Sequence, residues 1–386
     1  MKRITGQFVD CTTAGETVRA FVPISLPPRP ELVLTPEINA RLQQAVARLS
    51  ELRVASYLVP SPDLFNYAFV RKEAVLSSQI EGIQATLTDL LNYEADPEQK
   101  SDDLQEVCNY LDALHFARKQ LSDPKGLPLS LRLIKEMHKR LMRGVRGASK
   151  RPGEFRNSQN WIGGTRPGNA HFVPPPPMEM RECLQALETF LNQDDKENAL
   201  IKIALVHVQF ETIHPFLDGN GRLGRLLIAL LLEAWGLLDA RLLYLSLHFK
   251  RNQQEYYRRL DGVRKDGDWE SWIAFFLDGI CTSSEEAIQA SQSLFRLFDR
   301  DRRRLLSSPN VVIPAVRLFE ELPNHPVLTI NQIVKLLKTT KPTAAKAVDV
   351  LIKLDILEET TGAKRNRMFG YKKYLAILKT DAKGEA

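Results

Sequence analysis

The chain has 386 residues, enough for two or three domains, and its 44% hydrophobic content is ordinary for a protein that folds around a core. Four widely spaced cysteines with no CxxC pair argue against a zinc site and a disulfide framework, and they fit a reducing cytosol. No apolar run approaches the ~18 residues of a membrane span, and none follows the basic N-terminus. We therefore expect a cytoplasmic protein without membrane contacts.

Positive charge is concentrated near the C-terminus. Residues 331–379 hold eleven Lys and Arg against four Asp and Glu, whereas the net charge of the whole chain is +6. Only this segment therefore suggests a polyanion as a partner.

Helical periodicity dominates the chain after a proline-rich arm over residues 1–30, which we expect to be extended. The apolar spacing predicts helices over about 35–58, 66–79, from 86, 107–121, 129–142, 178–191, 198–212 and 222–235, with long helical stretches continuing to about 306. Residues 157–177 differ, because Gly-Gly, Pro-Gly and short β-prone runs indicate a β-hairpin flap.

The last eighty residues have another pattern. Residues 329–337 and 342–354 are predicted to form two helices joined by a turn, and two short strands follow around the basic loop TGAKRN. This order is typical of a winged helix, whose basic side chains could contact DNA phosphates: Lys341, Lys346, Lys364, Arg365 and Arg367. A protein-docking or dimerisation module with a solvated basic face is the alternative, and a homodimer stays open.

A glycine-rich loop between two predicted helices could hold an anion. Gly219 and Gly221 let the backbone turn and approach a ligand closely, and the next helix offers free N–H groups at its start. Arg222 and Arg225 lie three residues apart in the first turn of that helix, where both can reach phosphate oxygens.

The same loop also carries groups suited to catalysis. His214 stands at its entrance, and imidazole is the usual general base near neutral pH. Asp218 is a hard oxygen ligand beside the glycines, suitable for Mg²⁺ bound to phosphates. Together these residues suit phosphoryl-group transfer, while a plain connecting loop with solvated charges is the alternative.

The run HPFLDGNGRLGR, residues 214–225, resembles the Fic family signature HxFx(D/E)GNGRxxR and matches every fixed position. The resemblance extends over about residues 65–280 and includes LYLSLHFKRNQQEYYRRL. It implies that His214 deprotonates a target hydroxyl, that Asp218 holds Mg²⁺, and that Arg222 and Arg225 bind the β- and γ-phosphates of ATP. The implied nucleotide-binding set also includes Gly219, Asn220, Gly221, Leu223 and Gly224.

Several assignments in and around this loop have a packing alternative. Phe216 is interpreted as an anchor that packs inward, and Leu223 and Gly224 favour packing of the helix over contact with a ligand. Downstream, Arg251 and Tyr257, with the neighbouring Tyr256, could line the nucleotide pocket with a tyrosine against adenine, or could pack in the core. Four further histidines are interpreted as having no ligand role: His138, His171, His207 and His248.

A short segment upstream resembles the inhibitory motif of the same family, (S/T)xxxE(G/N). Ser77, Glu81 and Gly82 match its fixed positions. The resemblance implies that the Glu81 carboxylate pairs with Arg225 and occupies the group that should bind the γ-phosphate. A solvated glutamate at a helix end is the alternative.

The sequence thus predicts an all-α Fic core with a flap and a C-terminal winged helix, divided into residues 1–110, 111–306 and 307–386. The expected activity is transfer of AMP from Mg-ATP to a Tyr, Thr or Ser hydroxyl of a target protein that docks along the flap, residues 160–173. Three alternatives stay open: removal of AMP from a protein, protein phosphorylation, which Gly221 disfavours, and a DNA-binding regulator whose core senses nucleotide.

Overall fold

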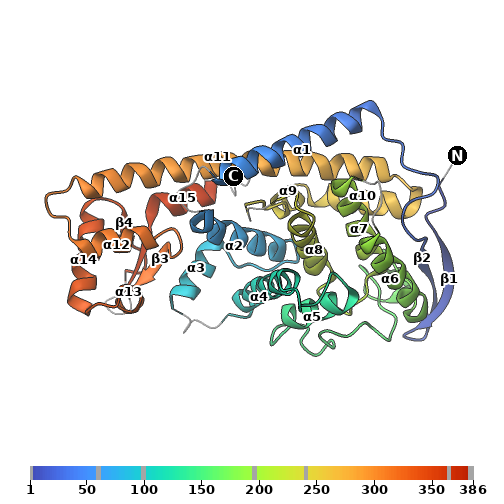
Figure 1. The fold of residues 1–386 in the computed structure, drawn as a ribbon. Coiled ribbons are helices and arrows are strands. Elements are labelled where there is room, and N and C mark those ends of the chain that lie inside the picture. The colour runs from blue at the N-terminus through green and yellow to red at the C-terminus, as the bar shows by residue number, and fades with distance from the viewer. Residues whose placement is uncertain are drawn as a thin grey trace.

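The computed structural model describes residues 3–57, 62–96, 101–193, 198–238, 242–362 and 367–380, and it is mostly helical. One long helix, α11 (Trp269–Leu306), runs the length of the molecule and joins a larger and a smaller lobe (Figure 1). Helix α1 (Pro36–Tyr57) packs along α11. The described helices are not long and apolar enough to cross a membrane.

The larger lobe is built around two buried helices, α7 (Ala199–Ile213) and α8 (Asn220–Ala234). Every residue of α7 from Leu200 to Ile213 is buried, which explains why its sequence is apolar on nearly all sides. The helices around this pair are α2 (Pro62–Ile80), α3 (Leu87–Ala95), α4 (Asp102–Ser122), α5 (Leu131–Leu141), α6 (Pro177–Asn192), α9 (Ser246–Arg251) and α10 (Gln253–Asp266).

Polar side chains fix where several of these helices begin. Thr86 and Asp89 form a capping box at α3, since each side chain bonds the backbone N–H of the other residue. The starts of α4, α5, α7 and α11 are capped by Ser101, Ser130, Asn198 and Asp268. The sequence boundary at 110/111 falls inside α4, so the N-terminal segment and the core share that helix.

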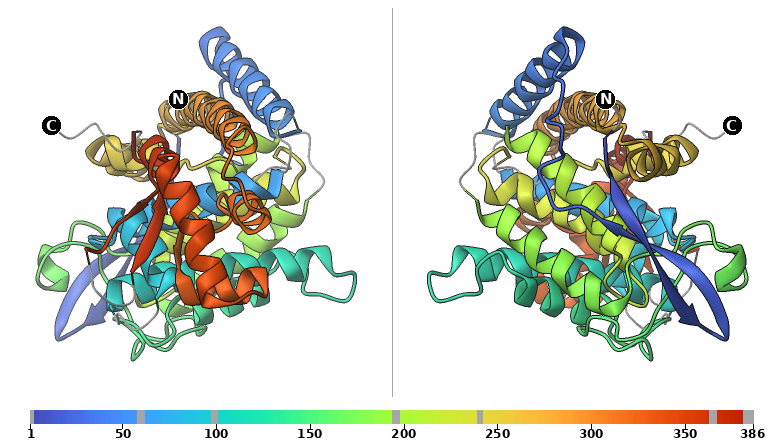
Figure 2. Two further views of the ribbon diagram at one scale, coloured as in Figure 1. Left: turned by 90° about the vertical axis from the view of Figure 1, so that its left-hand side faces the viewer. Right: turned by 90° about the vertical axis from the view of Figure 1, so that its right-hand side faces the viewer.

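The N-terminal arm is a β-hairpin, which corrects the expectation of an extended segment. Strands β1 (Gly6–Thr13) and β2 (Glu16–Pro23) pair antiparallel, and Figure 2 shows the hairpin at the edge of the larger lobe. Ala14 and Gly15 both have positive φ, 49° and 79°, which matches the two-residue turn that suits the twist of paired strands. The turn was overlooked because Ala-Gly is a weaker turn signal than Asn-Gly or Asp-Gly.

The flap is less regular than the predicted hairpin. A single antiparallel bridge joins Ile162 to Phe172, and a short 3₁₀ turn, η1 (Pro167–Asn169), lies between them. The N-terminal hairpin supports it, because Phe21 N–H donates to the Val173 carbonyl at 2.9 Å.

The smaller lobe combines short helices with a three-stranded antiparallel sheet in the order β3-β5-β4. Its elements are α12 (Ile313–Glu321), β3 (Val327–Thr329), α13 (Ile330–Leu337), α14 (Lys341–Lys353), β4 (Leu357–Glu359), β5 (Met368–Tyr371) and α15 (Lys372–Thr380). The sequence predicted α13, α14 and the two later strands but not β3. Gln332 of this lobe donates to the Glu94 carbonyl at 3.0 Å, which ties the lobe to α3. Lys364 and Arg365 lie outside the described residues.

Candidate active site

The glycine-rich loop connects the two buried helices. His214 is the C-cap of α7 and has φ 48° and ψ 63°, a left-handed conformation that is uncommon for a residue other than glycine. Gly219 adopts the same region at the start of α8, with φ 75°. The chain therefore turns sharply at both ends of the loop, and the first turn of α8 faces into it.

A buried arginine from the segment before the flap fixes the position of His214. Arg156 is 1% exposed, and its Nε donates to the His214 carbonyl at 2.9 Å. Its other nitrogens donate to the carbonyls of Ser158, Pro175 and Ile213. One guanidinium group thereby joins the end of α7 to both ends of the flap.

The His214 imidazole is held in its neutral form. Burial, together with the positive charges of Arg264 and Arg156, lowers its pKa to about 3. Its Nδ1 is buried and has no hydrogen-bond partner among the described residues. A neutral imidazole at the loop entrance can accept a proton, as a general base must.

His138 of α5 supports the floor of the loop. Its ring stacks on Phe216 at 3.7 Å between centroids, and Phe216 is fully buried, as predicted. Its Nδ1 accepts from the Gly153 N–H at 2.9 Å, so Nε2 carries the proton and donates to the Asp218 carbonyl, also at 2.9 Å. Burial lowers the pKa of His138 to about 4. This histidine, which the sequence analysis set aside, positions the residue expected to bind metal.

The loop leaves the Asp218 carboxylate exposed while closing on itself. Asn220 accepts from the Phe216 N–H at 2.9 Å and donates to the Phe216 carbonyl at 2.8 Å. One Asp218 oxygen accepts from the Gly219 N–H at 2.6 Å. Among the described residues no group of three or more His, Cys, Asp or Glu could cage a metal ion. A lone exposed carboxylate beside an anion cradle fits Mg²⁺, which keeps waters and binds through one or two carboxylates plus phosphates.

The predicted inhibitory residues meet Arg225 at the far side of the loop. Arg225 Nη2 lies 2.7 Å from Glu81 Oε1 and 2.9 Å from the Ser77 carbonyl, and its Nε donates to Ser77 Oγ at 3.0 Å. The Arg225 side chain is 2% exposed and that of Glu81 is 37% exposed. A Cβ atom added to Gly221 would lie 2.3 Å from Glu81 Oε1, so this carboxylate covers the first turn of α8.

Two features hold Glu81 at the end of α2. Gly82 has φ 86°, so the chain leaves the helix through a left-handed residue, as glycine allows. Gln253 at the start of α10 donates to the Ile80 carbonyl at 3.1 Å. The end of the helix is thus fixed, while the Glu81 side chain keeps access to solvent.

Arg222, the other phosphate-binding candidate, has a different partner. Its Nη1 pairs with Oε2 of Glu106 from α4, and both side chains are buried. Its Nη2 lies 3.5 Å from the Met142 sulfur, and its Nε has no partner among the described residues. Glu106 was not among the residues predicted from the sequence.

The remaining candidate residues for nucleotide binding have different surroundings in the structure. The Leu223 side chain is fully buried, and Gly224 lets Glu211 and His207 pack closely against α8, which fits the packing alternative for both residues. Tyr257 is 45% exposed, and burial together with the nearby Glu81 charge raises its pKa, which places it beside Glu81. Tyr256 is buried, and its hydroxyl bonds His207 at 2.8 Å. Arg251 pairs with Glu286 of α11. Ligand contacts by Leu223, Gly224, Arg251 and Tyr257 stay predictions.

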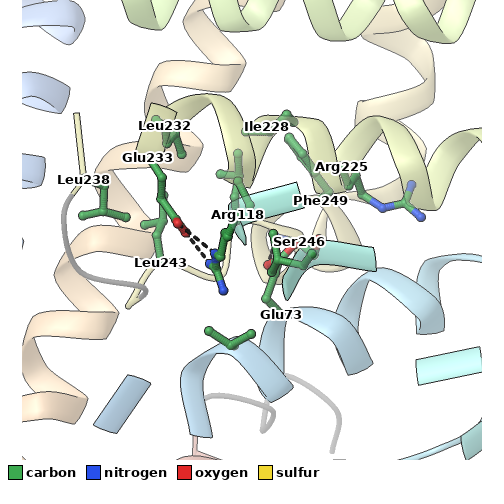
Figure 3. A pocket seen from close by; sticks show the side chains of 14 residues that line it. Glu73, Arg118, Arg225, Ile228, Leu232, Glu233, Leu238, Leu243, Ser246 and Phe249 are labelled. Atoms are coloured by element: carbon green, nitrogen blue, oxygen red, sulfur yellow. Dashed lines mark hydrogen bonds and ion pairs between the residues drawn. The ribbon is translucent and has the colours of Figure 1, made fainter. Parts of the chain in front are cut away.

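A mostly apolar pocket lies behind Arg225, between α2, α4 and α8 (Figure 3). Arg118 and Glu233 pair on its wall, and the Arg225 guanidinium points away from them. Glu73 accepts from the Ser246 N–H at 3.1 Å and from its hydroxyl at 2.5 Å, and burial raises the Glu73 pKa to about 7. The pocket thus lies where α2, which ends just before Glu81, meets the helix that carries Arg225.

The flap lies over the loop and joins it through side chains. Asn160 donates to the Phe216 carbonyl at 3.1 Å, and Arg264 stacks over Phe172 at 4.2 Å. Val173 packs with Val18 and Ala20 of β2 in a small separate cluster. The flap is thus held by contacts with the loop and with the N-terminal hairpin.

The positioning residues escaped the sequence analysis for different reasons. His138 lies on the apolar stripe of α5, with Ile134 and Leu141 one turn away on either side, and this spacing was an available signal. Arg156 binds carbonyl groups, and Glu106 binds an arginine 116 residues away, so neither gives a local pattern.

Comparisons with known proteins show which family and which relatives the chain is similar to. Residues 39–119 match the family described as Fic/DOC family N-terminal, and residues 128–232 match the Fic/DOC family. The chain is 32% identical over 159 residues to "Protein adenylyltransferase Fic" of Drosophila grimshawi and 31% identical to its namesake in Drosophila mojavensis, and each match covers 40% of this chain. The matched region spans only 29% and 28% of those relatives, less than a third of their length.

Solved structures resemble the chain over a larger part. A Fic family protein from Desulfovibrio desulfuricans G20 has a TM-score of 0.58 at 20% identity, covering 89% of this chain and 98% of that one. A Fic domain containing signalling protein from Bacteroides thetaiotaomicron has a TM-score of 0.51 at 18% identity, covering 65% and 97%. At these identities the likeness shows the fold alone, and it confirms a helical Fic core.

Proposed function

We propose that this chain, which matches Fic/DOC family models over residues 39–119 and 128–232, transfers AMP from Mg-ATP to a Tyr, Thr or Ser hydroxyl of a target protein. We propose further that Glu81 restrains this activity. The observation that carries the proposal is the arrangement around α8, where a neutral imidazole, an anion-binding helix start and a blocked arginine surround one loop.

The start of α8 supplies the electrostatics for a triphosphate. The N–H groups of Asn220 and Gly221 lie in the first turn of α8, where a helix has no backbone acceptors for them, and the positive end of the helix dipole favours anions there. Arg222 would take the β-phosphate and Arg225 the γ-phosphate once Glu81 has left. The Asp218 carboxylate would hold Mg²⁺, which neutralises phosphate charge as pyrophosphate leaves.

His214 would receive the proton in the chemical step. As the target hydroxyl attacks the α-phosphorus, its proton moves to the imidazole, and the bond from the α-phosphorus to the bridging oxygen of pyrophosphate breaks. We assign the proton to Nε2, because Nδ1 is buried. Arg156 contributes by holding the His214 backbone, since small displacements of a reacting group are costly.

The target segment would lie along the flap, residues 160–173. A segment in extended conformation could pair with the flap backbone, which selects for shape rather than for sequence. Most N–H groups of residues 162–172 already donate within the flap or to Glu16, so a target segment would pair beside the bridge between Ile162 and Phe172, at residues 160–164.

The test combines AMP transfer with nucleotide binding. His214→Ala should lower transfer from α-labelled ATP by ~10²–10⁴-fold, typical for loss of a general base, while Mg-ATP binding measured by calorimetry changes little. His115→Ala, at an exposed position of α4, is the control and should transfer normally. Near-full transfer by the His214 variant would remove the assigned role, and faster loss of AMP from a modified target in wild type would favour AMP removal instead.

The smaller lobe supports a second proposal, a winged helix that contacts DNA. Lys341 and Lys346 are exposed on α14, the second helix after the turn. Binding of a duplex should weaken steeply with salt, because bound counterions are released. Lys341→Glu with Lys346→Glu should weaken the fluorescence anisotropy signal at low salt, whereas Lys125→Glu in the larger lobe should not. An unchanged signal in the double variant would leave a docking role for this lobe.

A further inference from the structure

Arg222 and Glu106 form an ion pair inside the larger lobe. Arg222 is 4% exposed and Glu106 3% exposed, and Nη1 of the arginine pairs with Oε2 of the glutamate. The other Glu106 oxygen accepts from Arg146 at 3.1 Å, and Arg146 also pairs with Asp103 at the surface. The Glu106 carboxylate therefore has an arginine on each oxygen.

The rest of the Arg222 guanidinium lacks strong acceptors. Nη2 faces the Met142 sulfur at 3.5 Å, and a thioether is a weak acceptor. Nε is buried with no hydrogen-bond partner among the described residues. A buried donor without an acceptor is unfavourable, so these nitrogens are suited to a ligand that brings acceptor oxygens.

The glycine turn that would hold such a ligand lies near Arg222. The Met142 sulfur would lie 2.6 Å from a Cβ atom added to Gly219, so the thioether touches the turn on one side and Arg222 on the other. Nη2 of Arg222 thus lies one side chain away from the backbone that would cradle phosphate, with the Met142 thioether between them.

We propose that Glu106 is a positioning residue, which holds Arg222 in place for the β-phosphate of a nucleotide. The inference rests on the proposed function and deepens it. It follows from the contrast between the two carboxylates that pair with the arginines of α8. The Glu81 side chain directly follows the last residue of α2 and is 37% exposed, whereas the Glu106 side chain lies within α4 and is 4% exposed, with both oxygens engaged.

The two carboxylates therefore act in opposite directions. Glu81 can turn toward solvent and release Arg225, so its pairing is a block. Glu106 has no comparable freedom, and its pairing leaves Arg222 with donors to spare. Fixing the guanidinium before the nucleotide arrives removes an entropic cost of binding, which can be large for a long side chain.

A nucleotide series separates this role from general support of the fold. ATP and ADP carry a β-phosphate, and AMP does not. If Glu106 acts through Arg222, its loss should weaken ATP and ADP and spare AMP, whereas damage to the fold should weaken all three.

The experiment measures Mg²⁺-dependent binding of ATP, ADP and AMP by calorimetry to the full chain carrying Glu81→Gly. Glu106→Ala should weaken ATP and ADP by about tenfold and AMP by less than twofold, the size of one charge-assisted contact. Glu106→Gln should retain most of the affinity, because its amide oxygen can still accept from Arg222. Should Glu106→Ala fail to fold, Glu106→Asp, whose carboxylate is withdrawn by one methylene, should give the same selective loss.

Two further variants complete the test. Arg222→Ala should give the same pattern, and adding Glu106→Ala to it should have no further effect, because the two residues act as one unit. Arg146→Gln, which removes the exposed partner of Glu106, is the matched control and should bind all three nucleotides within twofold of the parent.

The inference is overturned if AMP weakens as much as ATP, or if Glu106→Ala and Glu106→Asp leave ADP binding unchanged. The outcome is separable from the proposed function, since these readings need no transfer. A selective loss in a protein that never transfers AMP would support the role of Glu106 and reject the activity. Ordinary AMP transfer with no selective loss would reject the role alone.

Discussion

Replacing Glu81 by glycine should convert a slow transferase into a fast one. In the structure the Glu81 carboxylate both pairs with Arg225 at 2.7 Å and covers the first turn of α8, where a Cβ atom on Gly221 would lie 2.3 Å away. Removing it frees the arginine and clears the space that a triphosphate needs. The free energy released is that of one charge-assisted contact, about 1.5–3 kcal/mol, or roughly tenfold to over a hundredfold in rate.

The lower part of that range is expected from the pairing alone. The Glu81 side chain is 37% exposed, and solvent weakens an ion pair of this kind. If Glu81 also holds the nucleotide in a wrong position, its removal raises the transfer rate further, because an error of about 1 Å in the position of a reacting group lowers the rate on the order of 10²-fold. Ser77 keeps its two contacts to Arg225 in the variant, so the arginine stays in place.

The assay is the initial rate of AMP transfer at saturating Mg-ATP, on the chain itself and on proteins of a cell lysate. Arg225→Ala should stay slow, and so should its combination with Glu81→Gly, since both lack the γ-phosphate ligand. Gln79→Gly places a glycine two residues earlier in α2 and is the control for mere loosening of the helix. The reasoning is refuted if Glu81→Gly is no faster than wild type, or if Gln79→Gly is equally fast.

Three more outcomes follow from the packing around the site. Arg156→Lys should lower the transfer rate by about 10²-fold with little change in ATP affinity, because one ammonium group cannot bond four carbonyls; equal rates would show that the flap needs no such anchor. Gly82→Ala should cost about 1–2 kcal/mol in urea unfolding and raise basal transfer, since a left-handed residue then carries a side chain; unchanged transfer would contradict this. Burial lowers the pKa of four histidines to about 3–4: His138, His207, His214 and His248. The native state therefore binds fewer protons than the unfolded chain below about pH 6.5, the pKa of an exposed histidine. Each histidine then lowers the unfolding free energy by up to ~1.4 kcal/mol for each pH unit below that value. Burial raises the pKa of two carboxyls, Glu73 and Glu211, to about 7, so these two groups increase the unfolding free energy as pH falls from about 7 to 4.5. Because four histidines oppose two carboxyls, we expect a lower unfolding free energy at about pH 5 than at about pH 6.5 in urea unfolding. A higher value at the lower pH would contradict this expectation.

The sequence was most informative where the functional residues are contiguous. His214, Asp218 and Arg225 lie within twelve residues, so their spacing alone suggested an anion site with a base beside it. The pairing of Glu81 with Arg225 spans 144 residues, and it was predicted only through the resemblance of a short motif. The structure brings these residues together as that resemblance implied.

Residues that act through the fold could not be identified in the same way. Arg156 bonds backbone carbonyls, which leave no mark on the sequence of its partners. Glu106 looked like any polar residue of a helix until α4 was placed against α8. Strand β3 has only three residues, all buried, which is too short for an alternating pattern.

The most direct test of the central claim is to give the Glu81→Gly chain ATP labelled at either the α- or the γ-phosphate. AMP transfer predicts that protein takes up the α-label, that the γ-label leaves with pyrophosphate, and that His214→Ala abolishes the uptake. Uptake of the γ-label without the α-label, or of neither label by chain and lysate alike, would contradict it.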